Sequence, residues 1–211
     1  MNCDRIASAY RWLEYSGFGH ELERRRFRYL ADVAGARHVL MLGEGDGRFL
    51  ARFAQANPQA SIEYVDSSRR MLDLARLHAG NGRICYKVAD ALDETRRAAN
   101  YDLICTHFFL DCFEGREIEL LAERLRATAR PGARWLVSEF RQPRRGWQTV
   151  WAWLWLRGLY LFFGIATGLR TRKLADHRPV LAKHGFRLKC EETSWFGLLA
   201  SELWVLTDSL V

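Results

Sequence analysis

The sequence predicts an α/β fold in which helices cover both faces of a mostly parallel, doubly wound sheet of seven strands. Three observations predict it. Short apolar runs alternate with segments of helical periodicity over residues 38–138, and the connections between them are short. The last two apolar runs follow each other with no helix between them. Alternation produces a parallel sheet with helices on both faces, and the final pair predicts an antiparallel C-terminal hairpin.

Two helices are expected before the first strand. Ile6, Tyr10 and Leu13 recur at helical spacing until Gly17 and Gly19 interrupt the pattern. A second helix is expected over residues 20–34, with an apolar face toward the core and a run of arginines opposite. We interpret residues 1–34 as an N-terminal helical cap.

The parallel strands are expected within residues 35–140. The apolar run at 38–42 is typical of a strand buried on both faces, and the runs at 62–66, 84–88, 102–106 and 135–138 predict four further strands. Helical spacing predicts helices at 49–56, around 68–75 and at 117–129, and Pro131-Gly132 is expected to turn into the fifth strand. The hairpin strands are expected at 186–192 and 201–206.

The composition is that of one globular domain. The chain has 211 residues, of which 49% are hydrophobic and 27% charged, which excludes wholesale disorder. No linker interrupts it, so we divide one domain into the cap (1–34), the core (35–140), a Trp-rich insertion (141–170) and a C-terminal helix and hairpin (171–211).

The charge and the cysteines exclude several function classes. The net charge of +7 comes from arginines that are spread along the chain and mixed with acids, as on an ordinary solvated surface. The five cysteines are odd in number and include no C-x-x-C pair, which argues against a disulfide framework and a zinc site. We expect no metal and a cytoplasmic location.

A glycine loop follows the first strand. Closely spaced glycines between a strand and a helix let the backbone approach a ligand without Cβ clashes. The dinucleotide fingerprint G-x-G-x-x-G/A fails here, because Arg48 or Leu50 stands at its last position. The pattern is instead G-x-G-x-G, formed by Gly43, Gly45 and Gly47.

Asp66 ends the second strand, about 20 residues past the loop, where an acid can accept hydrogen bonds from both hydroxyls of a ribose. A plain helix N-cap is the alternative for this acid. The glycine loop and Asp66 together favour ribose binding.

At this point the sequence resembles the class I S-adenosylmethionine-dependent methyltransferases. Val39 to Gly47 looks like their motif I, Tyr64 to Ser68 like motif II, and Ala89-Asp90-Ala91 like their adenine-side turn. Three further segments are similar in the right order: 101–113 to motif IV, 130–133 to the turn before the fifth strand, and 184–186 to the entry of the sixth. The resemblance implies a Rossmann-like fold, with S-adenosylmethionine as cofactor and S-adenosylhomocysteine as product.

The resemblance also implies roles for individual residues. The three glycines would pack against the methionine part and the ribose, and Asp66 would bind the ribose hydroxyls. Around the cofactor it implies the following further contacts: Ser67 and Met71 near the adenosine, Asp90 and Ala91 at the adenine, and His107 and Phe108 beside the methionine end. One position departs from the family, because Met41 stands where an acid is common; Glu44 or Asp46 is the expected replacement.

Methyl transfer from a sulfonium requires mainly that nucleophile, methyl and sulfur be aligned. Aromatic faces interact favourably with the spreading positive charge, and Tyr10, Tyr15 and Phe108 are candidates for that wall. If the nucleophile carries a proton, a base helps. His107 and Asp111 are the candidates, although His107 is more simply a residue that shapes the pocket.

The Trp-rich insertion is the expected substrate region. Trp147, Trp151 and Trp155 fall on one helical face. This face could pack on the core or on a second copy in a homodimer, line a lid over an apolar pocket, or contact a membrane surface peripherally. A spanning helix is disfavoured by Arg157. With Tyr10 and Tyr15, Trp147 and Trp151 are the predicted substrate contacts.

The function predicted is therefore methyl transfer to a small, apolar or aromatic acceptor. A non-catalytic cofactor-binding or scaffold protein of the same fold is the alternative, and an NAD-dependent oxidoreductase is disfavoured by the glycine spacing. Nucleic acid is not expected as a partner, because residues 106–109 lack the Asn/Asp-Pro-Pro-Tyr type of motif.

Overall fold

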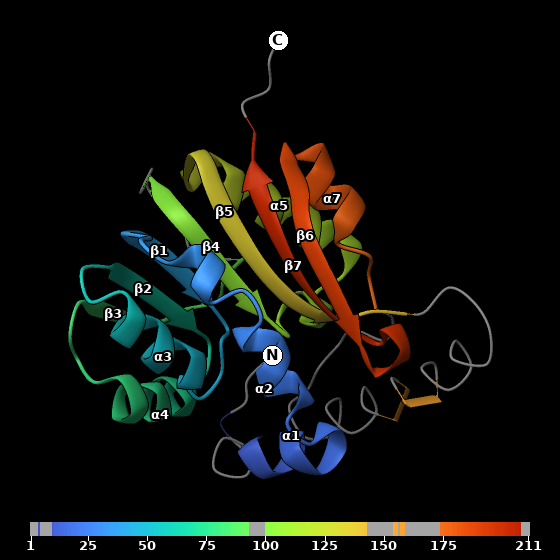
Figure 1. Cartoon of the computed structure of the whole chain (residues 1–211), viewed down its shortest axis with the longest axis horizontal. Coiled ribbons are helices and arrows are strands. Elements are labelled where there is room, and N and C mark those ends of the chain that lie inside the picture. Colours follow the sequence, from blue (N-terminus) through green and yellow to red (C-terminus); the bar gives the residue numbers. More distant parts are fainter. Residues whose placement is uncertain are drawn as a thin grey trace.

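The computed structural model describes residues 4, 10–92, 100–142, 154–155, 157–158 and 174–207. Its centre is a seven-stranded sheet with the strand order β3-β2-β1-β4-β5-β7-β6 (Figure 1). The parallel strands are β1 (His38–Leu42), β2 (Ser61–Asp66), β3 (Ile84–Val88), β4 (Tyr101–His107) and β5 (Ala129–Phe140). β6 (Phe186–Ser194) and β7 (Leu199–Leu206) form the antiparallel hairpin. The predicted fold class is confirmed.

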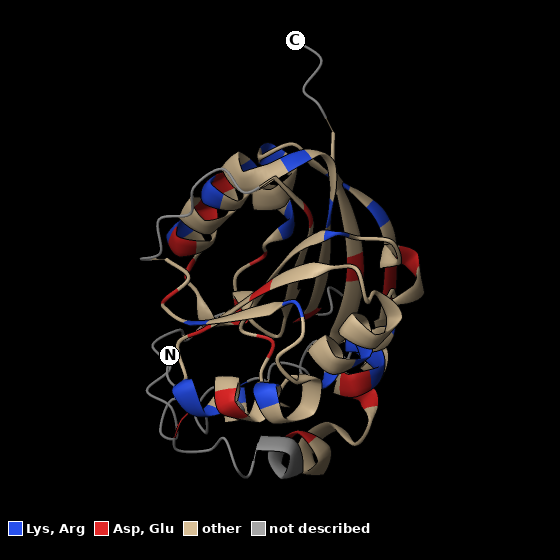
Figure 2. Cartoon of the chain, turned by 90° about the vertical axis from the view of Figure 1, so that its left-hand side faces the viewer, with Lys and Arg blue, Asp and Glu red and all other residues tan. Residues whose placement is uncertain are grey.

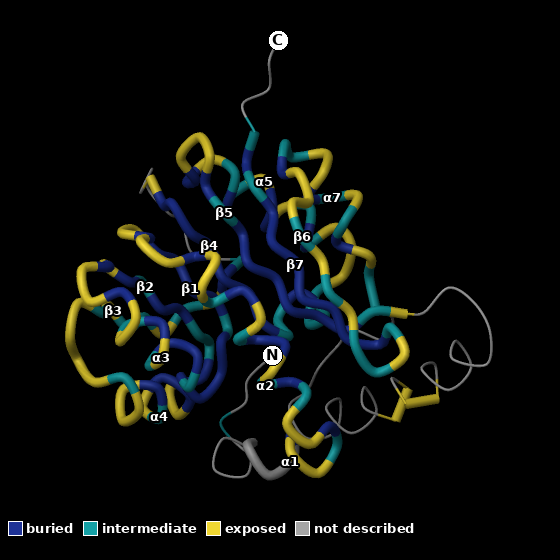
Figure 3. Tube along the Cα trace, viewed as in Figure 1, coloured by how far each residue is buried: buried dark blue, intermediate teal, exposed yellow. Residues whose placement is uncertain are grey.

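Helices cover both faces of this sheet. On one face, α3 (Arg48–Ala56) and α4 (Arg69–Ala79) pack with the 3₁₀ turn Ala31–Val33 over Val39, Met41 and Leu103. On the other, α5 (Gly115–Thr128) and α7 (Arg178–Lys183) pack over Leu40 and Leu42. The alternating residues of β1 thus enter opposite cores, which is why its sequence is apolar throughout. Figure 3 shows the inner strands β1, β4, β5 and β7 as the buried centre of the molecule.

Several boundaries differ from the sequence-based expectation. The second helix does not run over residues 20–34; α2 (Glu21–Phe27) ends early and the 3₁₀ turn follows it. The break brings Tyr29 and Val33 into the same core as Met41. The turn at Pro131-Gly132 lies inside β5 as an irregularity, since Tyr101 pairs with Ala129 but Leu103 already pairs with Arg134.

The arginine-rich segment near the N-terminus is neutralised by acids from distant elements. Arg25 donates to Glu192 at 2.8 Å, and Arg26 pairs with Glu14 of α1 (Tyr10–Phe18), where both side chains are buried. Figure 2 shows basic and acidic residues interspersed over the helices. Arg25 and Arg26 are thus buried ion-pair partners, and their charge is neutralised within the fold.

Candidate functional site

The glycine loop has a backbone that only glycine adopts without strain. Gly43, Gly45 and Gly47 have φ angles of 58°, 86° and 85°, in the left-handed region. A Cβ on Gly43 would collide with the ring of Phe109, and a Cβ on Gly47 with the backbone of Ala75 in α4. The loop therefore needs glycine at both ends for conformation and for space.

Neighbouring strands hold the loop in place. The amide of Gly43 donates to the carbonyl of Val65 at 2.9 Å, and the Tyr64 hydroxyl donates to the carbonyl of Gly45 at 2.6 Å. Tyr64 is fully buried. The loop is thus preorganised at the carboxyl edge of the parallel strands, where ligands of α/β sheets bind.

The two acids inside the loop have different environments. Asp46 receives two 2.9 Å hydrogen bonds from Nε of Arg48. Glu44 is buried, accepts from the amide of Phe49 at 3.2 Å through Oε1, and leaves Oε2 without a partner among the described residues. Burial raises the pKa of Glu44 to about 8, against the lowering effect of the Arg26 charge. Met41 is a core residue, with a fully buried side chain.

Asp66 lies at the end of β2, beside the loop. Its Oδ1 accepts from the amide of Ser68 at 2.8 Å, and Tyr64 donates to its Oδ2 at 3.4 Å. Burial raises the pKa of Asp66 to about 6, although the Ser68 bond lowers it. Ser68 rather than Ser67 is the N-cap of α4, and it accepts from the amide of Met71. The N-cap alternative for Asp66 is thus excluded by the neighbouring serine.

The adenine-side residues end the adjacent strand. β3 pairs with β2 so that Val88 lies opposite Asp66. Asp90, two residues later, is exposed and accepts from the amide of Leu92 at 2.9 Å, while Ala91 is buried. The expected ribose and adenine residues thus lie on adjacent strands at one edge, in the order that the family resemblance predicts.

His107 ends β4 and is sealed in the core. Only 1% of it is exposed, its Nδ1 lies 3.0 Å from Oγ of Ser138, and its ring meets Phe49 at 4.5 Å. Burial and the nearby Arg26 charge hold its pKa well below the usual value, so it stays neutral. This environment favours the pocket-shaping role over that of a base, which stays a prediction.

Phe108, the next residue, lies in a strained backbone conformation with φ of 52°. Its amide donates to the carbonyl of Ser138 at 2.6 Å, and its ring packs 5.1 Å from Phe140 and 5.3 Å from the guanidinium of Arg26. Positive φ in a bulky residue persists only when the surroundings impose it. The turn therefore aims this ring at the end of β5.

Asp111 belongs to a pair of carboxylates that sequence reasoning found only in part. Its partner is Glu139 of β5, which is 1% exposed and accepts from the amides of Phe109 and Leu110 at 2.8 and 2.7 Å. Burial raises the pKa of Asp111 to about 6, and burial and the Asp111 charge raise that of Glu139 well above its usual value. Glu139 could have been found from the sequence by the feature that identified Asp66, namely an acid at the end of a predicted strand.

An aromatic cluster, defined by Phe18, Phe108, Phe140, Trp155 and Trp195, covers this end of β5. Phe18 is its centre, with ring centroids 5.4 Å from Phe140, 5.8 Å from Trp155 and 5.0 Å from Trp195. Leu198 and Leu199 complete the apolar surface beneath it. The cluster brings together the cap, the strand ends, the Trp-rich insertion and the hairpin.

The predicted substrate residues are placed only in part. Tyr15 is 50% exposed and packs edge-on against His20 at 5.0 Å. Trp147, Trp151 and the Tyr10 side chain lie outside the described residues. The membrane contact and the homodimer were predicted from the same Trp-rich segment, and they remain predictions. Within the described ranges, no helix combines the length and the apolar character needed to cross a bilayer.

Comparison with known proteins matches part of the chain to one family. Residues 39–132 match the family described as "methyltransferase domain", a span that holds the glycine loop, Asp66, Asp90 and His107. No curated protein sequence matches the chain.

The solved structures give the same fold at low sequence identity. The N-methyltransferase NodS from Bradyrhizobium japonicum WM9 is similar with 14% identity and a TM-score of 0.62, over 89% of this chain and 98% of NodS. A Burkholderia thailandensis 1,6-didemethyltoxoflavin-N1-methyltransferase, solved with its substrate and S-adenosylhomocysteine, has 16% identity and a TM-score of 0.62, over 96% and 88% of the two chains. A Mesorhizobium loti S-adenosylmethionine-dependent methyltransferase has 17% identity and a TM-score of 0.65, over 87% and 99%.

Proposed function

We propose that this chain, whose residues 39–132 match the methyltransferase-domain family, is a class I S-adenosylmethionine-dependent methyltransferase and methylates a small apolar or aromatic acceptor. One observation carries the acceptor class. The aromatic cluster lies against the end of β5 and contains Phe108, which directly follows the predicted methionine-end residue His107. An acceptor bound there is an apolar or aromatic molecule, since such surfaces bury apolar groups.

The residues of the loop fit the cofactor. Its three glycines have positive φ angles, so the backbone can approach a ligand without Cβ atoms in the way, and Asp66 offers a carboxylate at the strand end. We assign the amino group of the methionine part to Glu44 rather than to Asp46. Asp46 is already engaged by Arg48, whereas Glu44 keeps one buried oxygen without a partner among the described residues. An ammonium group beside Glu44 would favour its charged form.

The remaining roles follow the same geometry. Ser67, Met71, Asp90 and Ala91 would surround the adenosine. The bound cofactor supplies an activated methyl group, so the chain's own task is to orient the acceptor and exclude water. Phe108 would place an aromatic face beside the charge that spreads during transfer.

Calorimetry with S-adenosylhomocysteine and with NAD tests the cofactor site. We expect the first to bind and the second not to bind. Asp66→Ala should weaken S-adenosylhomocysteine binding about 10- to 100-fold, because hydrogen bonds to a charged group contribute about 1.5–3 kcal/mol. Binding of NAD alone, or an unchanged affinity in the variant, would show that the ribose site is misassigned.

Adenosine separates the two acids, because it has the ribose but lacks the methionine part. Glu44→Gln should weaken S-adenosylhomocysteine binding and leave adenosine binding unchanged, whereas Asp66→Ala should weaken both. Asp46→Asn is the matched control, with both affinities expected to stay near wild type. An effect of Asp46→Asn without one of Glu44→Gln would reverse the assignment.

A methyl-transfer assay distinguishes an active enzyme from a non-catalytic scaffold protein. The protein is incubated with cofactor that carries a radiolabelled methyl group and with fractionated metabolite extracts. Label should move into a small, organic-extractable product. Tight binding of S-adenosylhomocysteine without a labelled product in any fraction would favour the non-catalytic alternative.

A further inference from the structure

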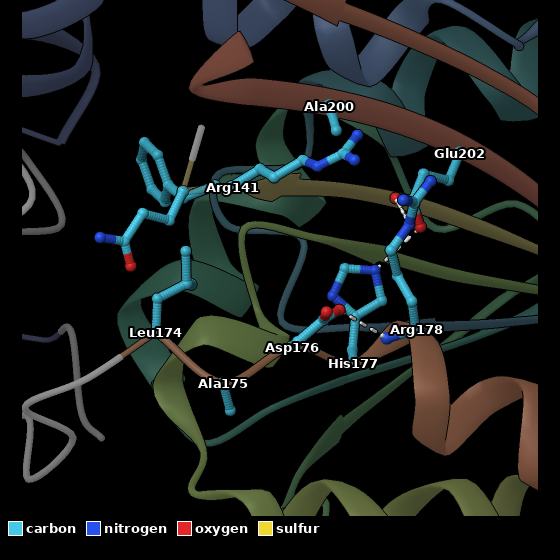
Figure 4. A pocket seen from close by; sticks show the side chains of 10 residues that line it. Arg141, Leu174, Ala175, Asp176, His177, Arg178, Ala200 and Glu202 are labelled. Atoms are coloured by element: carbon cyan, nitrogen blue, oxygen red, sulfur yellow. Dashed lines mark hydrogen bonds and ion pairs between the residues drawn. The ribbon is translucent and has the colours of Figure 1, made fainter. Parts of the chain in front are cut away.

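A cavity opens at the same edge of the sheet, beyond Phe140. It has a volume of about 390 Å³, within the range of small-molecule sites. Its walls come from the end of β5, the start of β7 and the segment that enters α7, as Figure 4 shows. Phe140 lines the cavity and also contacts Phe108 at 5.1 Å. The cavity therefore adjoins the aromatic cluster.

One wall of the cavity carries a buried histidine joined to a buried carboxylate. Nε2 of His177 lies 2.9 Å from Oε2 of Glu202, and the two residues are 7% and 1% exposed. Trp204 donates to the same carboxylate oxygen at 2.8 Å, and Nε of Arg178 lies 2.9 Å from the other. Glu202 is thus fixed by three neighbours, and it fixes the orientation of the imidazole.

The second nitrogen of His177 lies on the side of the ring that is turned away from Glu202. Figure 4 shows the ring between Glu202 and the middle of the pocket, with this nitrogen turned away from Glu202. Nδ1 has no hydrogen-bond partner among the described residues, and His177 lines the cavity. A hydrogen bond from Nε2 to a carboxylate leaves Nδ1 as the proton acceptor of a neutral imidazole.

The charges around His177 and Glu202 favour a histidine that accepts a proton over a site that binds an anion. Burial by itself would raise the pKa of Glu202, but the hydrogen bond from His177 and the charge of Arg178 hold it below its usual value, so this carboxylate is charged. The two arginines in the walls are already paired: Arg141 with Glu191, and Arg178 with Glu191 and Glu202. An acidic ligand would therefore find no spare positive charge there, whereas an imidazolium at His177 would face a fixed negative charge.

We propose that His177 is the catalytic base of this chain and takes the proton of an aromatic hydroxyl bound in the cavity, with Glu202 as its positioning residue. This rests on the proposed methyl transfer. The acceptor oxygen forms a bond to the methyl carbon while the methyl–sulfur bond breaks. The electron pair of the broken bond stays on sulfur. The hydroxyl proton passes to Nδ1 of His177, and water later removes it.

Two phenols test this assignment without knowledge of the natural acceptor. Phenol must lose its proton during transfer, whereas 4-nitrophenol is largely ionised at mildly alkaline pH and needs no base. His177→Asn should lower methylation of phenol by about 10²–10⁴-fold, the usual contribution of a general base, and change that of 4-nitrophenol much less. Glu202→Gln should lower the phenol rate by a smaller factor with the same selectivity. His184→Asn is the matched control, since His184 contacts Glu119 at 3.1 Å at the far end of α7.

Chemical modification gives a readout that does not depend on turnover. Diethyl pyrocarbonate acylates accessible neutral imidazole nitrogens, and peptide mapping should find His177 modified faster than the sealed His107. Phenol should protect His177 and leave modification of His184 unchanged. S-adenosylhomocysteine affinity, measured on every variant, shows that the fold and the cofactor site are intact.

The outcomes are distinguishable. If wild-type protein fails to bind S-adenosylhomocysteine, the proposed function itself fails. If it binds but phenol neither protects His177 nor is methylated, the cavity is not an aromatic-hydroxyl site. Equal losses for the two phenols in His177→Asn would overturn the role of base and indicate a residue that only shapes the cavity.

Discussion

Gly47→Ala should separate two reasons for glycine at the end of the loop. Gly47 has φ of 85° and ψ of 13° as the N-cap of α3, and a left-handed backbone costs a residue with a Cβ about 1–2 kcal/mol. The new methyl group would also collide with the backbone of Ala75. Because α4 cannot yield as a flexible side chain does, this overpacking adds about 1–3 kcal/mol. The free energy of unfolding should therefore fall by about 2–5 kcal/mol.

Gly35→Ala is the matched control for this change. Its φ is 79°, and a Cβ there would meet nothing within 4 Å, so only the backbone cost of about 1–2 kcal/mol remains. Urea unfolding of both variants gives the difference, which is the contribution of the contact between the loop and α4. Equal losses in the two variants would refute the reasoning that close packing on Ala75 excludes a side chain.

Two further perturbations test charges near the site. Asp66→Asn should raise the free energy of unfolding by about 1–3 kcal/mol at about pH 8 while weakening S-adenosylhomocysteine binding. The folded-state pKa of about 6 exceeds the ordinary 3.8, so the charged form opposes folding, and the gain should vanish as pH falls from 6 toward 4; a gain independent of pH would contradict this. Glu14→Ala should cost about 3–5 kcal/mol in urea unfolding because Arg26, 3% exposed, would lose its buried partner. Glu21, whose partner Arg24 is exposed, serves as control, with a change within about 0.5 kcal/mol for Glu21→Ala; similar losses in both would sink the argument from burial.

Local pattern predicted the parts of the fold that depend on neighbours in the chain. Apolar runs predicted the inner strands best, because a strand buried on both faces, such as β1, is apolar at successive positions. The edge strands β3 and β6 are only partly buried. The second helix was predicted too long, since Tyr29 and Val33 continue the helical spacing although they enter the core by way of a 3₁₀ turn. Helical periodicity records which residues are buried, not whether the backbone between them is continuous.

The sequence by itself determined the glycine loop, with Asp66 and Asp90 at the ends of the next two strands. These features are local, because a loop's backbone and a strand's last residue depend on few neighbours. Tertiary structure alone decided which acid of the loop keeps an unpartnered oxygen, and it joined His177 to Glu202 across 25 positions of the chain. The contacts of these side chains depend on the strand order that places β7 beside β5 and on how deeply each side chain is buried. Neither can be predicted from local sequence. Aromatic residues from the cap, the insertion and the hairpin meet at Phe18 for the same reason.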